Sequence, residues 1–254
     1  MASSPVILIT AGTAGLGASV ARLFAKNGFA VVVNYNSDTA RAETFLAELN
    51  ETPLSANGSG PKHMAIKANL ASQSDVCRLV EETYRSQDRI DVIFSNGGWT
   101  KFRDTSQIND NVFEEDWDVA FTMNVKSHLW LLHAAKDHLE QTEGAFITTS
   151  SIAGISGMGS SLAYAATKAA QLHMVKGLAS MVAPKIRVNS VSPGLLETDW
   201  AKRFSAEQKE QHRMQTKLKQ FVQVEDVAQH VLTLANSRST TGINIIVDAG
   251  YIVQ

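Results

Sequence analysis

Tyr164 and Lys168 are the residues whose types and spacing most clearly allow chemistry. They lie four residues apart in Tyr-Ala-Ala-Thr-Lys, and on a helix that spacing puts both side chains on one face. A free tyrosine phenol has a pKa of about 10 and exchanges protons poorly at neutral pH. A neighbouring ammonium favours the phenolate and lowers that pKa. The pair therefore predicts a tyrosine that can donate or accept a proton.

Glycines cluster near the start of the chain, in Thr10-Ala11-Gly12-Thr13-Ala14-Gly15-Leu16-Gly17. Glycines at a strand-to-helix turn let the backbone approach a pyrophosphate, and the helix N-terminus offers unpaired N–H groups to it. A glycine cluster alone can also be a simple tight turn. Here an apolar run precedes it and an amphipathic stretch follows, which favours a dinucleotide-binding loop.

Alternating strands and helices must position these residues. Short runs rich in Val and Ile predict seven strands, over Val6–Thr10, Ala30–Tyr35, His63–Ala68, Asp91–Ser95, Ala145–Thr149, Ile186–Val191 and Ile243–Val247. Amphipathic stretches predict helices over Gly15–Asn27, Thr39–Leu49 with Asp38 as N-cap, Asp75–Arg85 with Ser74 as N-cap, Phe113–Ala135 with or without a break, Tyr164–Met181 and Val224–Asn236.

The strand runs are continuous rather than alternating, which is typical of strands buried on both faces of a parallel sheet. Strand–helix alternation gives right-handed βαβ units. The expected fold is therefore α/β, a single-domain Rossmann-type doubly wound parallel sheet with helices on both faces. No second core or linker is visible, so the domain is expected to span residues 1–254.

Composition excludes several classes of function. The 254 residues are 44% hydrophobic with a net charge of −2, which gives no support for a nucleic-acid partner. No signal peptide or membrane span is visible, so we expect a cytoplasmic protein with no membrane partner. His128, His133 and His138 recur every five residues and do not share a helix face. We interpret them as interface or surface residues and expect no metal site.

The motifs together resemble the short-chain dehydrogenase/reductase family over about residues 7–250, in particular NADPH-dependent ketoreductases of the 3-oxoacyl-carrier-protein reductase type and fungal polyketide-type ketoreductases. Gly15 and Gly17 match the family's glycine loop, whose first glycine falls on Ala11. The Tyr-x-x-x-Lys pair matches as well. The family's final Val-Asp-Gly-Gly reads Val247-Asp248-Ala249-Gly250 here.

The resemblance implies four catalytic residues. The family's spacing of thirteen selects Ser151 over Ser150 as the partner of Tyr164. Tyr164 would be the general acid in reduction, and Ser151 would bind the substrate oxygen. Lys168 would lower the pKa of Tyr164 and bind the nicotinamide ribose. Asn124 would hold a water that links Lys168 to solvent, as part of a proton relay.

The resemblance also implies a nicotinamide cofactor, and we expect NADP(H) over NAD(H). The acidic position that binds the ribose of NAD falls on Tyr35, so a 2′-phosphate is not repelled there. Arg41 is near, while Asp38 is either a helix N-cap or an acid facing the ribose. The expected cofactor-binding residues are Gly12, Thr13, Gly15, Leu16, Gly17, Tyr35, Asn36, Ser37, Asn69, Leu70, Asn96, Gly97, Gly98, Tyr164, Lys168, Pro193, Gly194, Leu196 and Thr198.

The implied substrate is a small-molecule carbonyl or alcohol, here a hydrophobic or cyclic secondary-metabolite carbonyl. Its expected binding residues are Trp99, Ser151, Ile155, Met158, Leu195 and Trp200, under a mobile lid at about residues 195–215. The family also implies a homotetramer or homodimer, with the Phe113–Ala135 and Tyr164–Met181 helices at an interface.

Two other classes of function stay open. One is a non-catalytic cofactor-binding sensor or scaffold, which the changed residues at Ala11 and Ser95 favour slightly. The other is an enzyme that uses the fold for a non-redox step or a cyclisation. The intact Asn124, Ser151, Tyr164 and Lys168 favour the oxidoreductase.

Overall fold

The structure, a computed structural model, describes residues 4–51, 62–157, 159–198, 201 and 204–253. Within these residues the strands are β1 (Val6–Ile9), β2 (Ala30–Tyr35), β3 (Met64–Lys67), β4 (Val92–Ser95), β5 (Ala145–Thr149), β6 (Arg187–Pro193) and β7 (Asn244–Val247). They form one sheet in the order β3-β2-β1-β4-β5-β6-β7, and every neighbouring pair is parallel.

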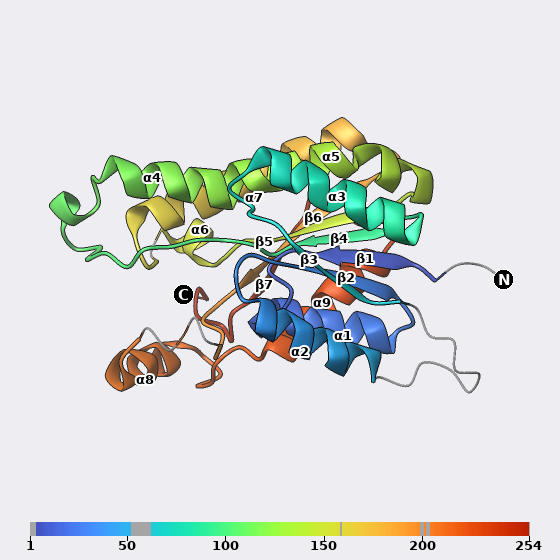
Figure 1. Cartoon of the computed structure of the whole chain (residues 1–254). Coiled ribbons are helices and arrows are strands. Elements are labelled where there is room, and N and C mark those ends of the chain that lie inside the picture. The colour runs from blue at the N-terminus through green and yellow to red at the C-terminus, as the bar shows by residue number, and fades with distance from the viewer. Residues whose placement is uncertain (1–3, 52–61, 158, 199–200, 202–203, 254) are drawn as a thin grey trace.

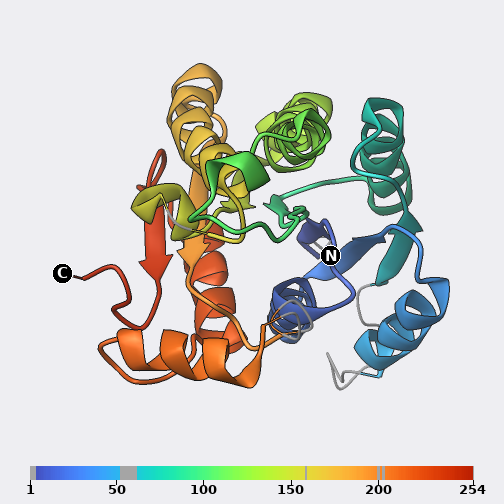
Figure 2. The same ribbon diagram turned by 90° about the vertical axis from the view of Figure 1, so that its left-hand side faces the viewer.

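Helices cover both faces of this sheet (Figure 1). They are α1 (Gly15–Lys26), α2 (Thr39–Asn50), α3 (Gln73–Gln87), α4 (Glu114–Phe121), α5 (Ser127–Thr142), α6 (Ala153–Ser156), α7 (Leu162–Val182), α8 (Ala206–Gln215) and α9 (Val224–Asn236). Figure 2 shows α7, α5 and α3 in a row above the sheet, and α9, α1 and α2 below it. The arrangement confirms the predicted doubly wound fold.

Each strand contributes to two hydrophobic layers, because successive side chains point to opposite faces. Ile7 and Ile9 of β1 pack in the layer of α1 and α9. Val6 and Leu8 of the same strand pack in the layer of α3, α5 and α7. Both faces are buried, which explains why the apolar runs of the sequence are continuous rather than alternating.

The topology fixes where a ligand can bind. Strand β1 pairs with β2 on one side and β4 on the other, so the loops that follow β1 and β4 diverge. Such a switch point opens a crevice at the carboxyl ends of parallel strands. In Figure 1 that end of the sheet, on the left, also carries α6, α8 and the C-terminus.

Most predicted boundaries are within two residues of the observed ones, with one wrong cap. Ser72, not Ser74, caps α3: its hydroxyl accepts from the Asp75 amide at 3.3 Å, and the helix begins at Gln73. The predicted Phe113–Ala135 helix is broken. A π-helical turn, η2 (Thr122–Lys126), separates α4 from α5. Among the described residues no helix is long and apolar enough to cross a membrane.

Candidate active site

A cavity of about 650 Å³ lies at the carboxyl ends of the strands. Its lining includes Ala14, Gly15 and Leu16 at the start of α1. It also includes Ser151, Tyr164 and Lys168, together with Phe204, residues of α8 and Tyr251. The residues expected to hold a cofactor and those expected to do chemistry thus share one continuous space.

Helix α7 presents Tyr164 and Lys168 to this cavity. The Ser161 hydroxyl caps the helix by accepting from the Tyr164 amide at 3.2 Å. Ser151, which follows β5, shares a side-chain hydrogen bond with Tyr164. The Lys168 ammonium lies 5.7 Å from the centroid of the Tyr164 ring. The structure therefore brings together the three residues that the sequence selected from separate segments.

Burial dominates the proton affinities of this group. It raises the pKa of Tyr164 to about 12, and the hydrogen bond with Ser151 acts in the opposite direction. The sequence predicted a lowered pKa for this phenol, and in the protein alone the shift is upward. Burial lowers the pKa of Lys168 to about 7. Its ammonium donates to the Thr149 carbonyl at 2.8 Å and to Gln171 Oε1 at 3.2 Å.

Asn124 lies on the π-helical turn η2 and is fully buried. Its amide nitrogen donates to the Trp99 carbonyl at 2.9 Å and to Thr167 Oγ1 at 3.0 Å, and its oxygen accepts from the Trp99 amide at 2.7 Å. An added Cβ on Gly98 would lie 3.3 Å from Asn124 Oδ1 and 3.7 Å from Lys168 Nζ. The glycine therefore keeps open a small space that both polar groups face.

The start of α1 is shaped for an anion. Its N-cap, Ala14, makes no side-chain cap, and the first turn carries no acid. The free N–H groups and positive end of the helix dipole therefore face the cavity uncompensated. Gly17 allows close packing, since a Cβ there would overlap the Ala11 carbonyl. These features fit the pyrophosphate of a dinucleotide.

Ala11, where the family has a glycine, adopts the left-handed conformation, with φ of 49°. Ala249, the other alanine in a family glycine position, has φ of 52°. The loop around Ala11 is held by Asn34, whose Oδ1 accepts from the Ala11 amide at 3.2 Å and whose carbonyl accepts from the Gly12 amide at 2.9 Å. The backbone shape is thus kept although the residue has changed.

The expected cofactor residues divide into two groups. Those that line the cavity are Gly15, Leu16, Asn96, Gly98, Tyr164, Lys168, Pro193, Gly194, Leu196 and Thr198. Those that do not are Gly12, Thr13, Gly17, Tyr35, Asn36, Ser37, Asn69, Leu70 and Gly97. Some of the second group support the walls: a Cβ on Gly97 would overlap the Leu70 side chain.

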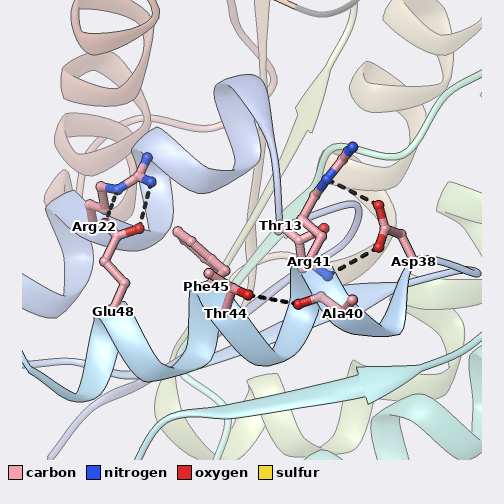
Figure 3. Close-up of a pocket in the computed structure, with 8 residues that line it drawn as sticks. All are labelled: Thr13, Arg22, Asp38, Ala40, Arg41, Thr44, Phe45 and Glu48. Atoms are coloured by element: carbon pink, nitrogen blue, oxygen red, sulfur yellow. Dashed lines mark hydrogen bonds and ion pairs between the residues drawn. The ribbon is translucent and has the colours of Figure 1, made fainter.

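A second cavity, of about 440 Å³, lies beside the start of α2 and includes Thr13 in its lining (Figure 3). Asp38 caps α2 by accepting from the Arg41 amide at 3.0 Å, which confirms the N-cap interpretation. Its other oxygen lies 3.2 Å from Arg41 Nε. Arg41 lines both cavities, so the acid at this position is paired with a cation.

The expected substrate residues are only partly brought together. Ser151 and Leu195 line the catalytic cavity, whereas Trp99 and Ile155 do not. Met158 and Trp200 lie outside the described residues. Sequence reasoning did not name several residues of the lining, among them Gln208, Gln211, His212, Gln215 and Tyr251, although the first four lie within the lid expected at about residues 195–215. The four on α8 are spaced by three, four and seven, a helical signal that was present in the sequence.

The expectation that His128 is an interface or surface residue was wrong. It is buried, with 1% exposure, and its Nδ1 shares a hydrogen bond of 2.6 Å with Ser95 Oγ. Burial and the nearby Lys168 charge lower the pKa of His128 to about 3. The described residues contain no cluster of His, Cys, Asp and Glu that could hold a metal.

Comparisons with known proteins agree over nearly the whole chain. A family model described as enoyl-(acyl carrier protein) reductase matches residues 10–252. Ketoacyl reductase 2, assigned to the granaticin polyketide synthase of Streptomyces violaceoruber, is 32% identical over 250 residues, covering 97% of this chain and 96% of the relative. The 3-oxoacyl-(acyl-carrier-protein) reductase FabG of Staphylococcus aureus is 32% identical over 251 residues, covering 96% of each chain.

Solved structures match as well. A short chain dehydrogenase from Burkholderia cenocepacia, crystallised in complex with NADP, superposes with a TM-score of 0.86 at 27% identity and covers 98% of each chain.

Proposed function

This chain belongs to the short-chain dehydrogenase/reductase family, and we propose that it interconverts a ketone and a secondary alcohol with Tyr164 as general acid and base. One observation carries the proposal. Ser151 and Tyr164 are hydrogen-bonded beside Lys168 in a cavity that the uncapped start of α1 also lines.

The two hydroxyls suit one carbonyl oxygen. Ser151 and Tyr164 both line the cavity, so a substrate oxygen can accept from both in place of their mutual bond. The raised pKa of about 12 keeps Tyr164 protonated at neutral pH, the state that a proton donor needs in reduction. As the proton leaves, the nearby Lys168 ammonium favours the phenolate that forms.

The cofactor would lie along the cavity from α1 to Tyr164. The start of α1 would hold its pyrophosphate, and Pro193, Gly194, Leu196 and Thr198 would hold its nicotinamide end. When bound, the nicotinamide supplies the hydride. The space beside Gly98 supports the proposal that Asn124 and Lys168 share a water in a proton relay.

The pairing of Asp38 supports a preference for NADP(H). Its carboxylate accepts a hydrogen bond from the start of α2 and pairs with Arg41. Arg41 also lines both cavities. A 2′-phosphate needs a cation and the absence of a free acid. The substrate we propose is a cyclic carbonyl. Trp99 and Ile155 do not line the cavity, but Leu195, Leu196 and Phe204 do, which supports the hydrophobic part of the expectation.

Replacement of Tyr164 tests the chemistry. In Tyr164→Phe, NADPH-dependent ketone reduction should fall by about 10²–10⁴-fold, the usual contribution of a general acid. NADPH binding, followed by cofactor fluorescence, should survive. Tyr84→Phe, on α3, is the matched control and should keep full turnover. Unchanged turnover in Tyr164→Phe would remove Tyr164 as the acid; binding of NADPH with no turnover in the unmodified protein would favour a sensor.

Arg41 tests the cofactor preference. Arg41→Ala should raise KM for NADPH by about tenfold while KM for NADH changes little, because a charge-assisted hydrogen bond to the phosphate is lost. Arg22→Ala is the control, since Arg22 lines only the second cavity and pairs with Glu48 at 2.9 Å. Equal changes in both KM values would contradict a role at the 2′-phosphate.

A further inference from the structure

Helix α8 turns an uncharged polar face toward the catalytic cavity. The four residues of that face are Gln208, Gln211, His212 and Gln215. The charged residues of the helix do not line the cavity; they are Glu207, Lys209, Glu210 and Arg213. Arg213 and Glu210 instead pair with each other, with Nε and Oε2 at 2.8 Å. The three glutamines are exposed to solvent, so they form an open side of the cavity, and the charged residues of the helix lie off it.

The side-chain amides of Gln208 and Gln215 in this lining are already oriented. The Gln208 side-chain oxygen accepts from the Ser205 amide at 2.9 Å in the cap of α8. The Gln215 oxygen accepts from the Tyr251 hydroxyl at 3.0 Å. Both oxygens are thus occupied, and neither side-chain NH₂ group has a hydrogen-bond partner among the described residues. The wall therefore presents two oriented hydrogen-bond donors.

Flat rings lie beside these donors. The ring of His212 stacks on Tyr251, with centroids 4.4 Å apart and planes at 15°. Phe204 also lines the cavity and packs edge-on against Phe102, with centroids at 4.9 Å. Burial lowers the pKa of His212, so this ring is neutral at neutral pH.

The charged residues that line the cavity are not on α8. Among the described residues its lining includes no carboxylate, and its cations are Arg41 and Lys168, which the proposed function assigns to the cofactor and the reacting group. Apolar side chains such as Leu195, Leu196 and Phe204 also line the cavity, as in most ligand pockets, where a few placed polar groups fix the orientation of the ligand. Amide donors beside these apolar groups and flat rings suit a planar molecule with oxygen acceptors.

We propose that the substrate is a neutral cyclic ketone carrying further hydroxyl or carbonyl oxygens, which accept hydrogen bonds from Gln208 and Gln215 while its ring lies against Tyr251 and His212. This inference rests on the proposed function, because it takes the same cavity as the site of reduction. It makes α8 the determinant of specificity rather than of the chemical step.

Two matched probes test it, 1-tetralone and 6,7-dihydroxy-1-tetralone, with the N-acetylcysteamine thioester of acetoacetate as an acyl-chain probe. With NADPH, the unmodified protein should show a kcat/KM for the dihydroxy ketone about tenfold above that for 1-tetralone, as expected for two added hydrogen bonds. The double variant Gln208→Met and Gln215→Met should bring the ratio near one by raising KM, with kcat and NADPH affinity unchanged. Lys209→Met, on the outer face of α8, should keep the ratio.

Binding without turnover gives a second measurement. In the NADPH complex of Tyr164→Phe, calorimetry should show that the dihydroxy ketone binds about tenfold more weakly once both glutamines are replaced. Equal kcat/KM for the two tetralones, or preference for the thioester, would overturn the inference and leave the reductase proposal standing. Reduction of none of the probes, with NADPH still bound, would count against the reductase itself.

Discussion

Two alanines hold a backbone conformation that alanine disfavours. Ala11 and Ala249 have φ of 49° and 52°, in the left-handed region where a Cβ approaches the following carbonyl oxygen. Both stand where the family has glycine. The hydrogen bonds of Asn34 to the Ala11 and Gly12 segment show how the loop keeps its shape. Ala11 is therefore a site of local strain and does not change the path of the chain.

Relief of that strain is measurable. Ala11→Gly should raise the free energy of unfolding by about 0.5–1 kcal/mol, because glycine adopts positive φ freely. Ala47→Gly, an exposed position inside α2, is the matched control and should lower it by about the same amount. Urea denaturation of the three proteins gives the comparison. A loss of stability in both variants would show that Ala11 is not strained.

At the scale of elements, α5 is joined to β4 through one buried histidine. The hydrogen bond between His128 and Ser95 links the first turn of the helix to the end of the strand. Ser95 replaces an asparagine of the family pattern. The sequence showed that Ser95 departs from the family pattern but not that it meets His128, because β4 and α5 are separated along the chain and only the fold brings them together.

The pH dependence of stability tests this contact. With its folded pKa lowered to about 3, His128 stays neutral in the fold, whereas the unfolded chain takes up a proton below about pH 6.5. The stabilisation of the fold that comes from neutral His128 is therefore present above pH 6.5 and is lost as the pH falls. Over that range the free energy of unfolding should decrease by up to about 1.4 kcal/mol per pH unit.

His128→Gln should reduce that slope between pH 4.5 and 6.5, measured by urea denaturation at each pH. Other buried groups titrate in both proteins, so only the difference between them reports His128. His133→Gln, at an exposed position of the same helix, should leave the slope as it is. An identical slope in all three proteins would show that His128 is protonated in the fold.

At the scale of the whole molecule, the apolar runs of the sequence predicted the seven strands and a parallel sheet that is buried on both faces. Strands such as Ala30–Tyr35 and Ala145–Thr149 were placed at their observed bounds, because both faces of the sheet are buried and the apolar runs are unbroken. The sequence placed a lid over the substrate at about residues 195–215, which includes α8, but it did not indicate which side chains of that helix line the cavity. Gln208 and Gln215 are exposed and have no apolar signal, and only the tertiary structure places them in the lining of the cavity that holds Tyr164.

Large apolar side chains remain exposed along α4 and α5, and this favours the expected homodimer or homotetramer. Val112 is 63% exposed, Phe113 45%, Phe121 38% and Leu129 42%, over the helices expected at an interface. Monomers rarely leave apolar groups gathered on one surface. We propose that a second copy of the chain covers them, and light scattering after size exclusion should give two or four times the chain mass.

A charge placed in that surface should separate the copies. Phe121→Lys combined with Leu129→Lys would bury two unpaired ammonium groups in the interface, so the measured mass should fall toward that of one chain at micromolar concentration. Ala47→Lys, at an exposed position on α2, adds one lysine away from these helices and should leave the mass unchanged. A monomeric unmodified protein, or an oligomer that survives both lysines, would place the contact between copies elsewhere.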